Sequence, residues 1–354
     1  MSTDTDSTTD EATRFDRVDW EAYAGGRRSR LSLTSTLFVL TAAPIVALAV
    51  YNRYAVGDRE TVFGALGAAT GLPLEALGLD FAVAPVDYAF ALTLLLFVWY
   101  LVVPLYRHPR ITAHYWRRFR RNRPALVSLA WLAVVFVGGL AGPLLLSPPE
   151  QNLLAGHQPP VGLSVAEANV AQCVGEVTNG RCAGTWEYPL GTTRGGKGVF
   201  TSVVYGMTIS MKIAFITTTV VAGVGVAVGT VSAYAGGWVD EVAMRAVDIV
   251  LSFPTLLFFL LILYVYGAGL GMFIVVFSLF GWGGTARYVR SKALSVSEEE
   301  FVKAGRLSGA STRRIVRRHV VPNTASSIIT QLTLLIPGFL LAEAQLAFLG
   351  LGDS

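Results

Sequence analysis

The chain has 354 residues, of which 53% are apolar and only 15% charged, and its formal net charge is +4 at pH 7. Its apolar runs are too long for a soluble core to surround, which excludes a basic soluble domain. The positive charge comes largely from arginine clusters beside these runs, so it indicates membrane topology and not nucleic-acid binding. The expected class is an all-α, polytopic transmembrane protein.

The N-terminal part begins with a polar segment and continues into two apolar runs. Residues 1–30 are rich in acidic, Ser and Thr residues, which predicts a disordered cytoplasmic tail; without a basic leader they do not form a signal peptide. The runs Leu33–Tyr51 and Tyr88–Tyr106 predict a transmembrane hairpin over 31–106. Arginines flank the hairpin on both sides, so the 52–87 loop is expected outside.

The segment 107–124 is strongly basic. We expect it to anchor the topology on the cytoplasmic side, with Tyr115, Trp116 and Phe119 reaching the headgroups as part of an interfacial helix. Membrane lipid is therefore one expected partner. The arginines of this segment are Arg107, Arg110, Arg117, Arg118, Arg120, Arg121 and Arg123.

A third run, Ala125–Leu146, leads to a long external loop at 147–205 that contains both cysteines. Disulfides persist outside the cytoplasm, so a bond between Cys173 and Cys182 is the preferred reading, with two free thiols as the alternative. Two cysteines with no histidine between them do not complete a tetrahedral set, so no metal site is expected.

The same loop contains a run with the spacing of a phosphate-binding loop. Gly191–Lys197 reads GTTRGGK, but Gly198 stands where a magnesium-binding Ser or Thr is required, and the segment is external. We therefore expect that this chain binds no ATP, magnesium or other cofactor.

The fourth and fifth spans carry signals for packing and bending. Ile213–Tyr234 is rich in small residues, which is typical of close helix contacts in lipid. Arg245 and Asp248 are three residues apart at the edge of the next span, and we expect an ion pair between them in preference to a proton relay. Pro254 follows Phe253 inside this span and predicts a kink, which suits a moving part beside a pore.

The stretch Glu298–Asn323 is the longest charged, helix-prone segment in the second half of the chain. It lies between the expected sixth span, Leu270–Tyr288, and the seventh, Ser326–Leu341. Its excess of arginine places it on the cytoplasmic side. We expect Gly309 to divide it into two short helices and Pro322 to close the second. Such a hairpin is suited to docking in a groove of a partner.

This stretch resembles the EAA loop in permease subunits of ATP-binding-cassette importers for dipeptides, oligopeptides and nickel. That pattern reads Glu-Ala-Ala, three residues, Gly, nine residues and Ile-x-Leu-Pro. The matching positions, with the histidine common in the peptide branch, are Ala304, Gly309, His319 and Pro322. The departures are Lys303, Gly305 and Val321. The resemblance implies a coupling role for Lys303, Ala304, Gly305, Gly309, Ala310, Ser311, Arg314, His319 and Pro322.

Other runs resemble the same family in the same order, over roughly residues 110–354. Trp116–Phe119 resembles its Trp-Arg-Arg-Phe-like lead, and Pro189–Thr192 its Pro-Leu-Gly-Thr. Met244–Pro254 resembles its Met-Arg-x-x-Asp-x-x-Leu-x-Phe-Pro run, and Ala342–Gly352 its signature at the outer end of a span. Several motifs in order are far more specific than any one of them.

The resemblance implies an importer-type permease core at 125–354 with a cytoplasmic coupling loop at 291–325. The N-terminal hairpin has no counterpart and is an addition. Family members continue through one more span, so we expect the C-terminus after Ser354 to be truncated. The pore and gating candidates are Arg245, Asp248, Phe253, Pro254 and Glu343.

The resemblance also implies alternating access driven by partner subunits. The partners are a second permease subunit in a heterodimer, two ATPase subunits that hold ATP and magnesium, and an extracytoplasmic solute-binding protein. The chain itself is expected to be non-catalytic and to lie in the plasma membrane with a cytoplasmic N-terminus. Its expected substrates are di- and oligopeptides, with nickel or oligosaccharides as alternatives in the same family.

Two other classes are less favoured. An ion-coupled secondary transporter requires ionisable residues well inside its spans, whereas Asp248 and Glu343 lie near span ends. A membrane-embedded enzyme requires a nucleophile and base or a ligand cluster, and the histidines form none. The histidines are His108, His114, His157 and His319.

Overall fold

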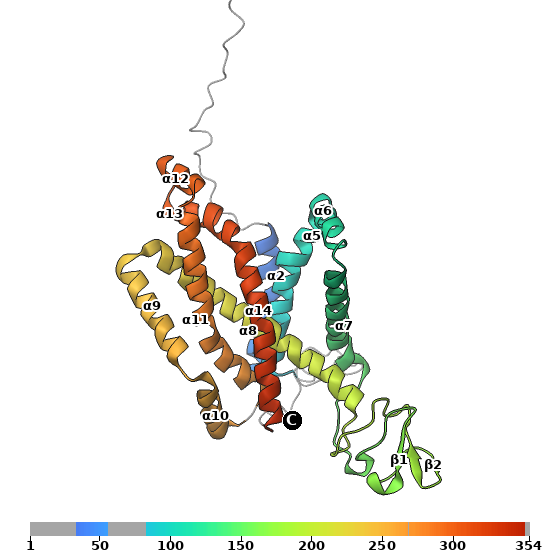
Figure 1. Ribbon diagram of the computed structural model, residues 1–354. Helices are drawn as coiled ribbons and strands as arrows, with labels where there is room; N and C mark the ends of the chain where they lie inside the picture. Colours follow the sequence, from blue (N-terminus) through green and yellow to red (C-terminus); the bar gives the residue numbers. More distant parts are fainter. Residues whose placement is uncertain (1–32, 56–82, 268, 351–354) are drawn as a thin grey trace, which may run out of the picture.

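The computed structural model describes residues 33–55, 83–267 and 269–350 (Figure 1). Among these residues, six helices are long and apolar enough to cross a membrane, and one bent helix pair adds a seventh candidate. This confirms the all-α, polytopic prediction. The expected tail at 1–30 and most of the 52–87 loop lie outside the described residues.

The N-terminal hairpin consists of two antiparallel spans. Its elements are α2 (Leu33–Ala55), α4 (Pro85–Phe97), the π-helical turn η2 (Val98–Val102) and α5 (Val103–Arg107). Trp99 Nε1 donates to Thr41 Oγ1 at 3.0 Å, and Asn52 Nδ2 donates to the Val83 carbonyl at 3.1 Å. The first bond joins the two spans near their middles, and the second joins the end of α2 to the segment just before α4.

A surface helix links the hairpin to the third span. The helix α6 (Pro109–Phe119) lies at the same end of the molecule as the later helix α12 (Figure 1). It exposes Tyr115, Trp116 and Phe119, and the last two rings stack with centroids 5.9 Å apart. This is the amphipathic form predicted for the basic segment. The third span, α7 (Arg123–Leu145), follows directly.

Residues 147–198, which we call the α7–α8 domain, form a small folded unit. Its sheet has the order β1-β3-β2, and all pairings are antiparallel. The elements are η3 (Leu153–Ala155), β1 (Ser164–Ala166), η4 (Glu167–Asn169), β2 (Val177–Thr178) and β3 (Arg181–Ala183). In the turn between β2 and β3, Asn179 and Gly180 both have positive φ, as an Asn-Gly hairpin turn requires.

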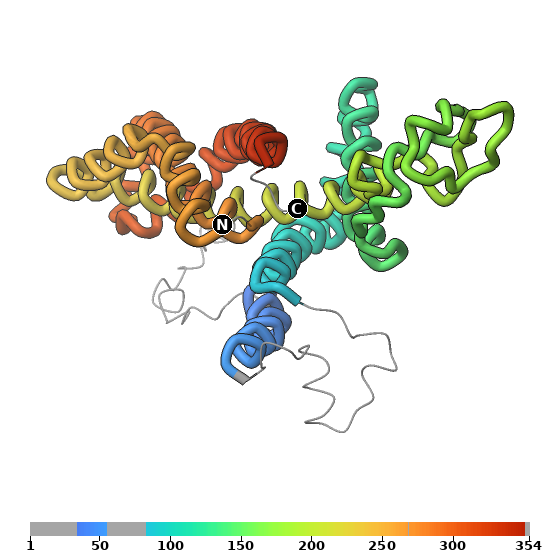
Figure 2. The backbone as a smooth tube through the Cα atoms, turned by 90° about the horizontal axis from the view of Figure 1, so that it is seen from below, coloured from blue at the N-terminus to red at the C-terminus, as the bar shows by residue number. Residues whose placement is uncertain are grey.

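The fourth span, α8 (Val199–Ala235), is the axis of the fold. It begins at Val199, so residues 199–205 are helical and the predicted end of the loop at 205 is wrong. Figure 2 shows α8 crossing the molecule, with the α7–α8 domain at one end, α9 and α11 at the other, and the N-terminal hairpin projecting from its middle.

Two glycines let α8 approach α11 (Leu270–Ser297) closely. A Cβ atom at Gly229 would lie 2.4 Å from the Ala286 carbonyl oxygen, and one at Gly225 would lie 2.7 Å from Thr285 Cγ2. This contact accounts for the small residues in the fourth span, because only glycine leaves room for the neighbouring backbone.

The fifth span is a bent pair, α9 (Gly237–Ser252) and α10 (Thr255–Tyr266), whose axes differ by 70°. The bend lies at Phe253 and Pro254, which confirms the predicted kink. The Phe253 ring stacks on Phe280 of α11 with centroids 4.7 Å apart. The bend is therefore supported by an aromatic contact with the next span.

The last described span is longer than the sequence predicts. It comprises α13 (Thr312–Ile315), the π-helical turn η5 (Val316–Val320) and α14 (Val321–Phe348), one continuous helical run of 37 residues. The prediction that Pro322 closes a separate helix is wrong. In the wider turn the Val321 N–H bonds to the Val316 carbonyl, and the helix continues through Pro322.

Candidate functional site

The stretch 298–323 folds as the predicted helix–glycine–helix hairpin. The helix α12 (Glu300–Leu307) ends in a Schellman motif: the Ala310 N–H bonds to the Gly305 carbonyl at 3.1 Å, and the Gly309 N–H to the Arg306 carbonyl at 3.0 Å. Gly309 has φ of 76°, a conformation that costs residues with a Cβ. The turn therefore depends on glycine at this position.

One face of this hairpin is fixed to the membrane helices. Val302, Ile315 and Val320 are almost completely buried, together with Ala293 near the end of α11. The residues packed around this cluster are Ala233, Tyr234, Val296 and Ala310. The hairpin is thus held against the ends of α8 and α11 by an apolar core of its own.

The opposite face of the hairpin is exposed and basic. Gly305, Ala310 and His319 are half-buried, and the other predicted coupling residues are exposed. The exposed ones are Lys303, Ala304, Gly309, Ser311, Arg314 and Pro322. Phe301 lies beside His319, with ring centroids 6.1 Å apart. We call this exposed face, which carries most of the residues predicted to act in coupling, the coupling surface.

A salt-bridge cluster lies close to the buried side of the hairpin. Arg290 of α11 donates to Asp240 of α9 through Nε at 2.6 Å and Nη2 at 2.5 Å. The Ser232 hydroxyl of α8 bonds to the same carboxylate. Three helices therefore meet at the Asp240 carboxylate. The residues next to Asp240 in the sequence do not predict this meeting.

The predicted ion pair between Arg245 and Asp248 is wrong. Asp248 pairs with Arg287 of α11, and Arg245 pairs with Glu241 one turn earlier on α9 at 3.4 Å. Spacing along one helix made the first pairing possible, but α11 brings a better-placed guanidinium to Asp248. Arg287 and Arg290 are one turn apart, so α11 offers both partners to α9 from the same face.

The other pore candidates are divided between two regions. Phe253 and Pro254 form the bend described above. Glu343 is half-buried near the end of α14 that is remote from the coupling surface (Figure 1). The structure therefore does not gather the gating candidates into one cluster around Asp248.

Cys173 and Cys182 are joined by a disulfide in the α7–α8 domain. Cys182 is fully buried on β3, and the buried side chain of Gln158 ties the same region together. Its Nε2 donates to the Gln172 carbonyl at 2.5 Å, and its Oε1 accepts from the Val174 N–H at 3.1 Å. The disulfide and the Gln158 hydrogen bonds thus cross-link the loop between the third and fourth spans.

A third inter-helix salt bridge, which the sequence analysis does not predict, joins α4 and α8. Lys212 of α8 pairs with Asp87 of α4 at 2.6 Å, and each side chain is less than a third exposed. It joins the N-terminal hairpin to α8. Lys212 lies well inside α8, whereas the predicted fourth span started just after it. An ionisable residue directly before the apolar run was the available signal.

Two family models match this chain. The one described as the inner membrane component of binding-protein-dependent transport systems matches residues 220–354, and the one described as the N-terminal transmembrane domain of oligopeptide transport permease C matches residues 112–160. Both matched ranges lie after the N-terminal hairpin. The first covers the coupling surface and both salt bridges between α9 and α11.

Named relatives are similar over two thirds of the chain. The dipeptide transport system permease protein DppC of Bacillus subtilis is 35% identical over 239 residues, 67% of this chain and 67% of its own. The oligopeptide transport system permease protein OppC of Mycobacterium tuberculosis is 35% identical over 243 residues, 67% of this chain and 74% of its own. A putative peptide permease protein of Brucella abortus is 30% identical over 237 residues, 66% and 70%.

Proposed function

The chain belongs to the family of inner membrane components of binding-protein-dependent transport systems, as an ATP-binding-cassette permease subunit, and from this premise we propose that its coupling surface docks on an ATPase partner. The observation that carries the proposal is the two-sided hairpin at 298–323. One face is buried against α8 and α11, and the other is exposed. A partner that pulls on the exposed face therefore moves the membrane helices.

The salt-bridge cluster supports this transmission. Ser232, Asp240 and Arg290 link three spans close to the buried side of the hairpin. A displacement of α11 is passed to α9 through Asp240, and α9 leads to the bend at Pro254. In alternating access, the cytoplasmic ends of the helices then move as a rigid unit. The bend at Pro254 changes its angle to accommodate this movement.

The proposed assembly contains this chain, a second permease subunit in a heterodimer, two ATPase subunits and an extracytoplasmic solute-binding protein. ATP and magnesium are held by the ATPase subunits, and this chain provides the path and the coupling without hydrolysing ATP. Its N-terminus and coupling surface face the cytoplasm, as the arginine clusters indicate. The α7–α8 domain then faces the solute-binding protein on the other side.

We propose di- and oligopeptides as the substrates, because the relatives are named as dipeptide and oligopeptide permeases. Uptake of a labelled dipeptide into vesicles containing the full transporter tests this directly. Competition by unlabelled tetrapeptide, but not by nickel or an oligosaccharide, is expected. Nickel uptake at rates above those of peptides contradicts the peptide assignment and leaves the coupling assignment intact.

Docking is tested by a single engineered cysteine, because both natural cysteines are bonded to each other. Ser311→Cys places a thiol on the coupling surface, and we expect it to cross-link to an ATPase subunit in the assembled transporter. Ser164→Cys, which is exposed on β1 of the α7–α8 domain, is the matched control. Cross-linking of the control alone, or of neither variant, contradicts the proposed docking.

A further inference from the structure

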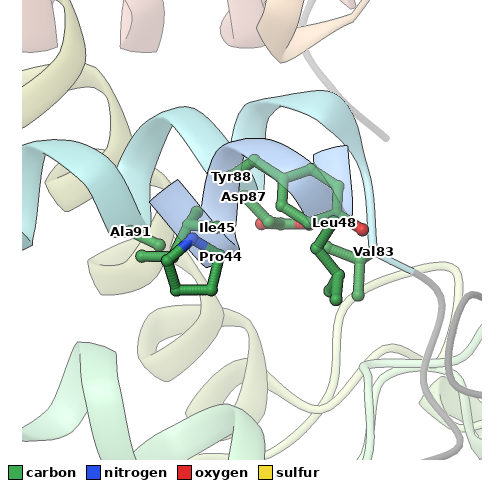
Figure 3. A pocket seen from close by; sticks show the side chains of 7 residues that line it. All are labelled: Pro44, Ile45, Leu48, Val83, Asp87, Tyr88 and Ala91. Carbon is green, nitrogen blue, oxygen red and sulfur yellow. The ribbon is translucent and has the colours of Figure 1, made fainter. Parts of the chain in front are cut away.

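The Asp248–Arg287 salt bridge is exposed, unlike the other salt bridges that the described residues form between different helices. Asp87 lines the apolar cavity between α2 and α4 (Figure 3), but it pairs with Lys212, and each of these side chains is less than a third exposed. The salt bridge at Asp240 is shielded to a similar degree. By contrast, the side chain of Arg287 is 56% exposed and that of Asp248 is 59% exposed. One ion pair between spans therefore faces away from the packed helices.

This exposed pair lies well inside the spans. Asp248 follows the start of α9 at Gly237 by about 16 Å along the helix, and Arg287 follows the start of α11 at Leu270 by about 25 Å. The two helices pack side by side (Figure 1). Because the hydrocarbon core of a bilayer is about 30 Å thick, both lengths place the pair within its depth. Charges at this depth do not face lipid, since hydrocarbon provides no hydration.

The exposed surface of α9 divides into a polar and an apolar sector. At the angular spacing of an α-helix, the exposed polar residues fall within about 60° of one another. These residues are Glu241, Arg245, Asp248 and Ser252. The adjoining sector carries large apolar side chains, among them Trp238, Val242 and Ile249. The apolar sector suits contact with lipid, whereas the polar sector is turned toward Arg287 of α11.

The polar sector continues onto α11. Gly284 is exposed one turn before Arg287, and a Cβ atom placed there would have no neighbour within 4 Å. We call the continuous surface the polar strip; it consists of Glu241, Arg245, Asp248 and Ser252 of α9 with Gly284 and Arg287 of α11. Its two acidic side chains and its two arginines balance in charge. Two of its members, Arg245 and Asp248, are pore candidates from the sequence.

The charges of the polar strip are already paired within this chain. Arg287 bonds to Asp248, and Arg245 lies 3.4 Å from Glu241. Burial of these pairs against lipid or another subunit would remove their water although their charges are already compensated, which costs free energy. A water-filled path leaves them hydrated. The ammonium and carboxylate groups at the two ends of a peptide are complementary to the acids and the arginines of this surface.

We propose that the polar strip lines the inner half of the substrate path and that its charges bind the two charged ends of a passing peptide. This role rests on the proposed function, because it presupposes a peptide permease. The α-ammonium group pairs with Glu241 or Asp248, and the α-carboxylate with Arg245 or Arg287. Because the strip is neutral as a whole, it holds neither end tightly and releases the peptide, as transport requires.

The test is thiol modification in single-cysteine variants, since both natural cysteines are bonded to each other. Ser252→Cys and Gly284→Cys place a thiol on the polar strip. Ile249→Cys and Leu279→Cys are the matched controls, because these residues are exposed on other faces of the same two helices. Inside-out vesicles that contain the full transporter are treated with a cationic, membrane-impermeant thiosulfonate. The reaction is followed with and without ATP, and the faster rate of each variant is compared.

We expect both strip variants to react at least about tenfold faster than their controls, because a thiol that faces lipid ionises less readily. Alanylalanine should slow the reaction of the strip variants. The same dipeptide with an acetylated amino end and an amidated carboxyl end should not. Strip variants that react as slowly as the controls overturn the proposal, and so does a lack of protection by alanylalanine. Equal protection by the capped dipeptide overturns the binding of charged ends.

Uptake of a labelled dipeptide is measured for each variant, so that the two proposals are tested separately. Normal uptake with an unreactive strip contradicts the role of the polar strip and leaves the proposed function intact. A wild-type transporter that takes up no peptide contradicts the proposed function itself. If Gly284→Cys does not assemble, Ser252→Cys decides, because serine and cysteine are similar in size.

Discussion

Arg290 of α11 and Asp240 of α9 form a salt bridge through two nitrogens and both carboxylate oxygens, at 2.6 and 2.5 Å. Both side chains are less than a third exposed. The pair therefore has fixed geometry and limited access to water, which makes it a structural joint between two spans.

Asp240→Asn is expected to destabilise this joint, because the Arg290 charge is left without its partner. We expect the free energy of unfolding in mixed micelles to fall by about 1–3 kcal/mol. Glu241→Gln breaks the neighbouring exposed pair with Arg245 and is expected to change stability by less than about 0.5 kcal/mol. Equal losses in the two variants contradict the special role of Asp240.

Gly309→Val is expected to impair coupling while the membrane helices stay folded. A Cβ at φ of 76° costs about 1–2 kcal/mol and distorts the turn that positions α12. ATP-driven peptide uptake should fall about tenfold. Gly206→Ala is the control, because that glycine of α8 lies outside the coupling surface, has open space around it and has a helical conformation. Normal uptake in Gly309→Val would contradict the coupling assignment.

Gly229→Val is expected to separate α8 from α11. Its Cβ would lie 2.4 Å from the Ala286 carbonyl oxygen, so a backbone has to move, at a cost of about 2–3 kcal/mol. Gly223→Val makes the same change six residues earlier on α8, where no atom lies within 4 Å. Thermal unfolding in micelles distinguishes the two sites. Comparable loss of stability in both variants contradicts close packing at Gly229.

Lys212→Met is expected to loosen the N-terminal hairpin, because it leaves the Asp87 carboxylate unpaired inside the apolar region. The expected loss is about 2–3 kcal/mol. Asp87→Asn in the same chain removes that charge and keeps an acceptor for the Ala84 N–H. The double variant should therefore be more stable than Lys212→Met. A denaturation cycle over the four proteins measures the coupling energy, and additive effects would contradict a direct pair.

Hydropathy was sufficient to predict that the spans exist, and glycine placement to predict the helix–glycine–helix hairpin at 298–323. The kink at Pro254 also followed from local chemistry, since proline cannot continue an α-helix unaltered. These features depend on neighbours in the sequence. They could be predicted because no distant residue was needed to decide them.

The errors lie where distant residues decide. Asp248 was assigned to Arg245 on its own helix, but its partner Arg287 comes from α11, 39 residues later. Lys212 and Asp87 meet only because the N-terminal hairpin packs on α8. No spacing rule joins such positions. The tertiary fold decides which oppositely charged residue pairs with each of these side chains, because local sequence patterns do not distinguish the possible partners.

The closing role given to Pro322 failed for a different reason. Two prolines in this chain, Pro104 and Pro322, each follow a π-helical turn, η2 and η5 respectively. In both, the wider turn carries the helix past the ring instead of ending it. A helix continues through a proline that follows a wider turn. A sequence rule for helix ends does not distinguish such a proline from one that ends a helix.

The continuous helix Thr312–Phe348 connects the coupling surface to the opposite end of the membrane-spanning region. Its 37 residues form a rod about 55 Å long, whose first turns belong to the coupling hairpin and whose last turns carry Glu343. If the rod pivots near its middle, a tilt of about 10° displaces each end by about 5 Å, roughly one helical turn. A force applied at one membrane face would then arrive at the other as a lever stroke in the opposite direction.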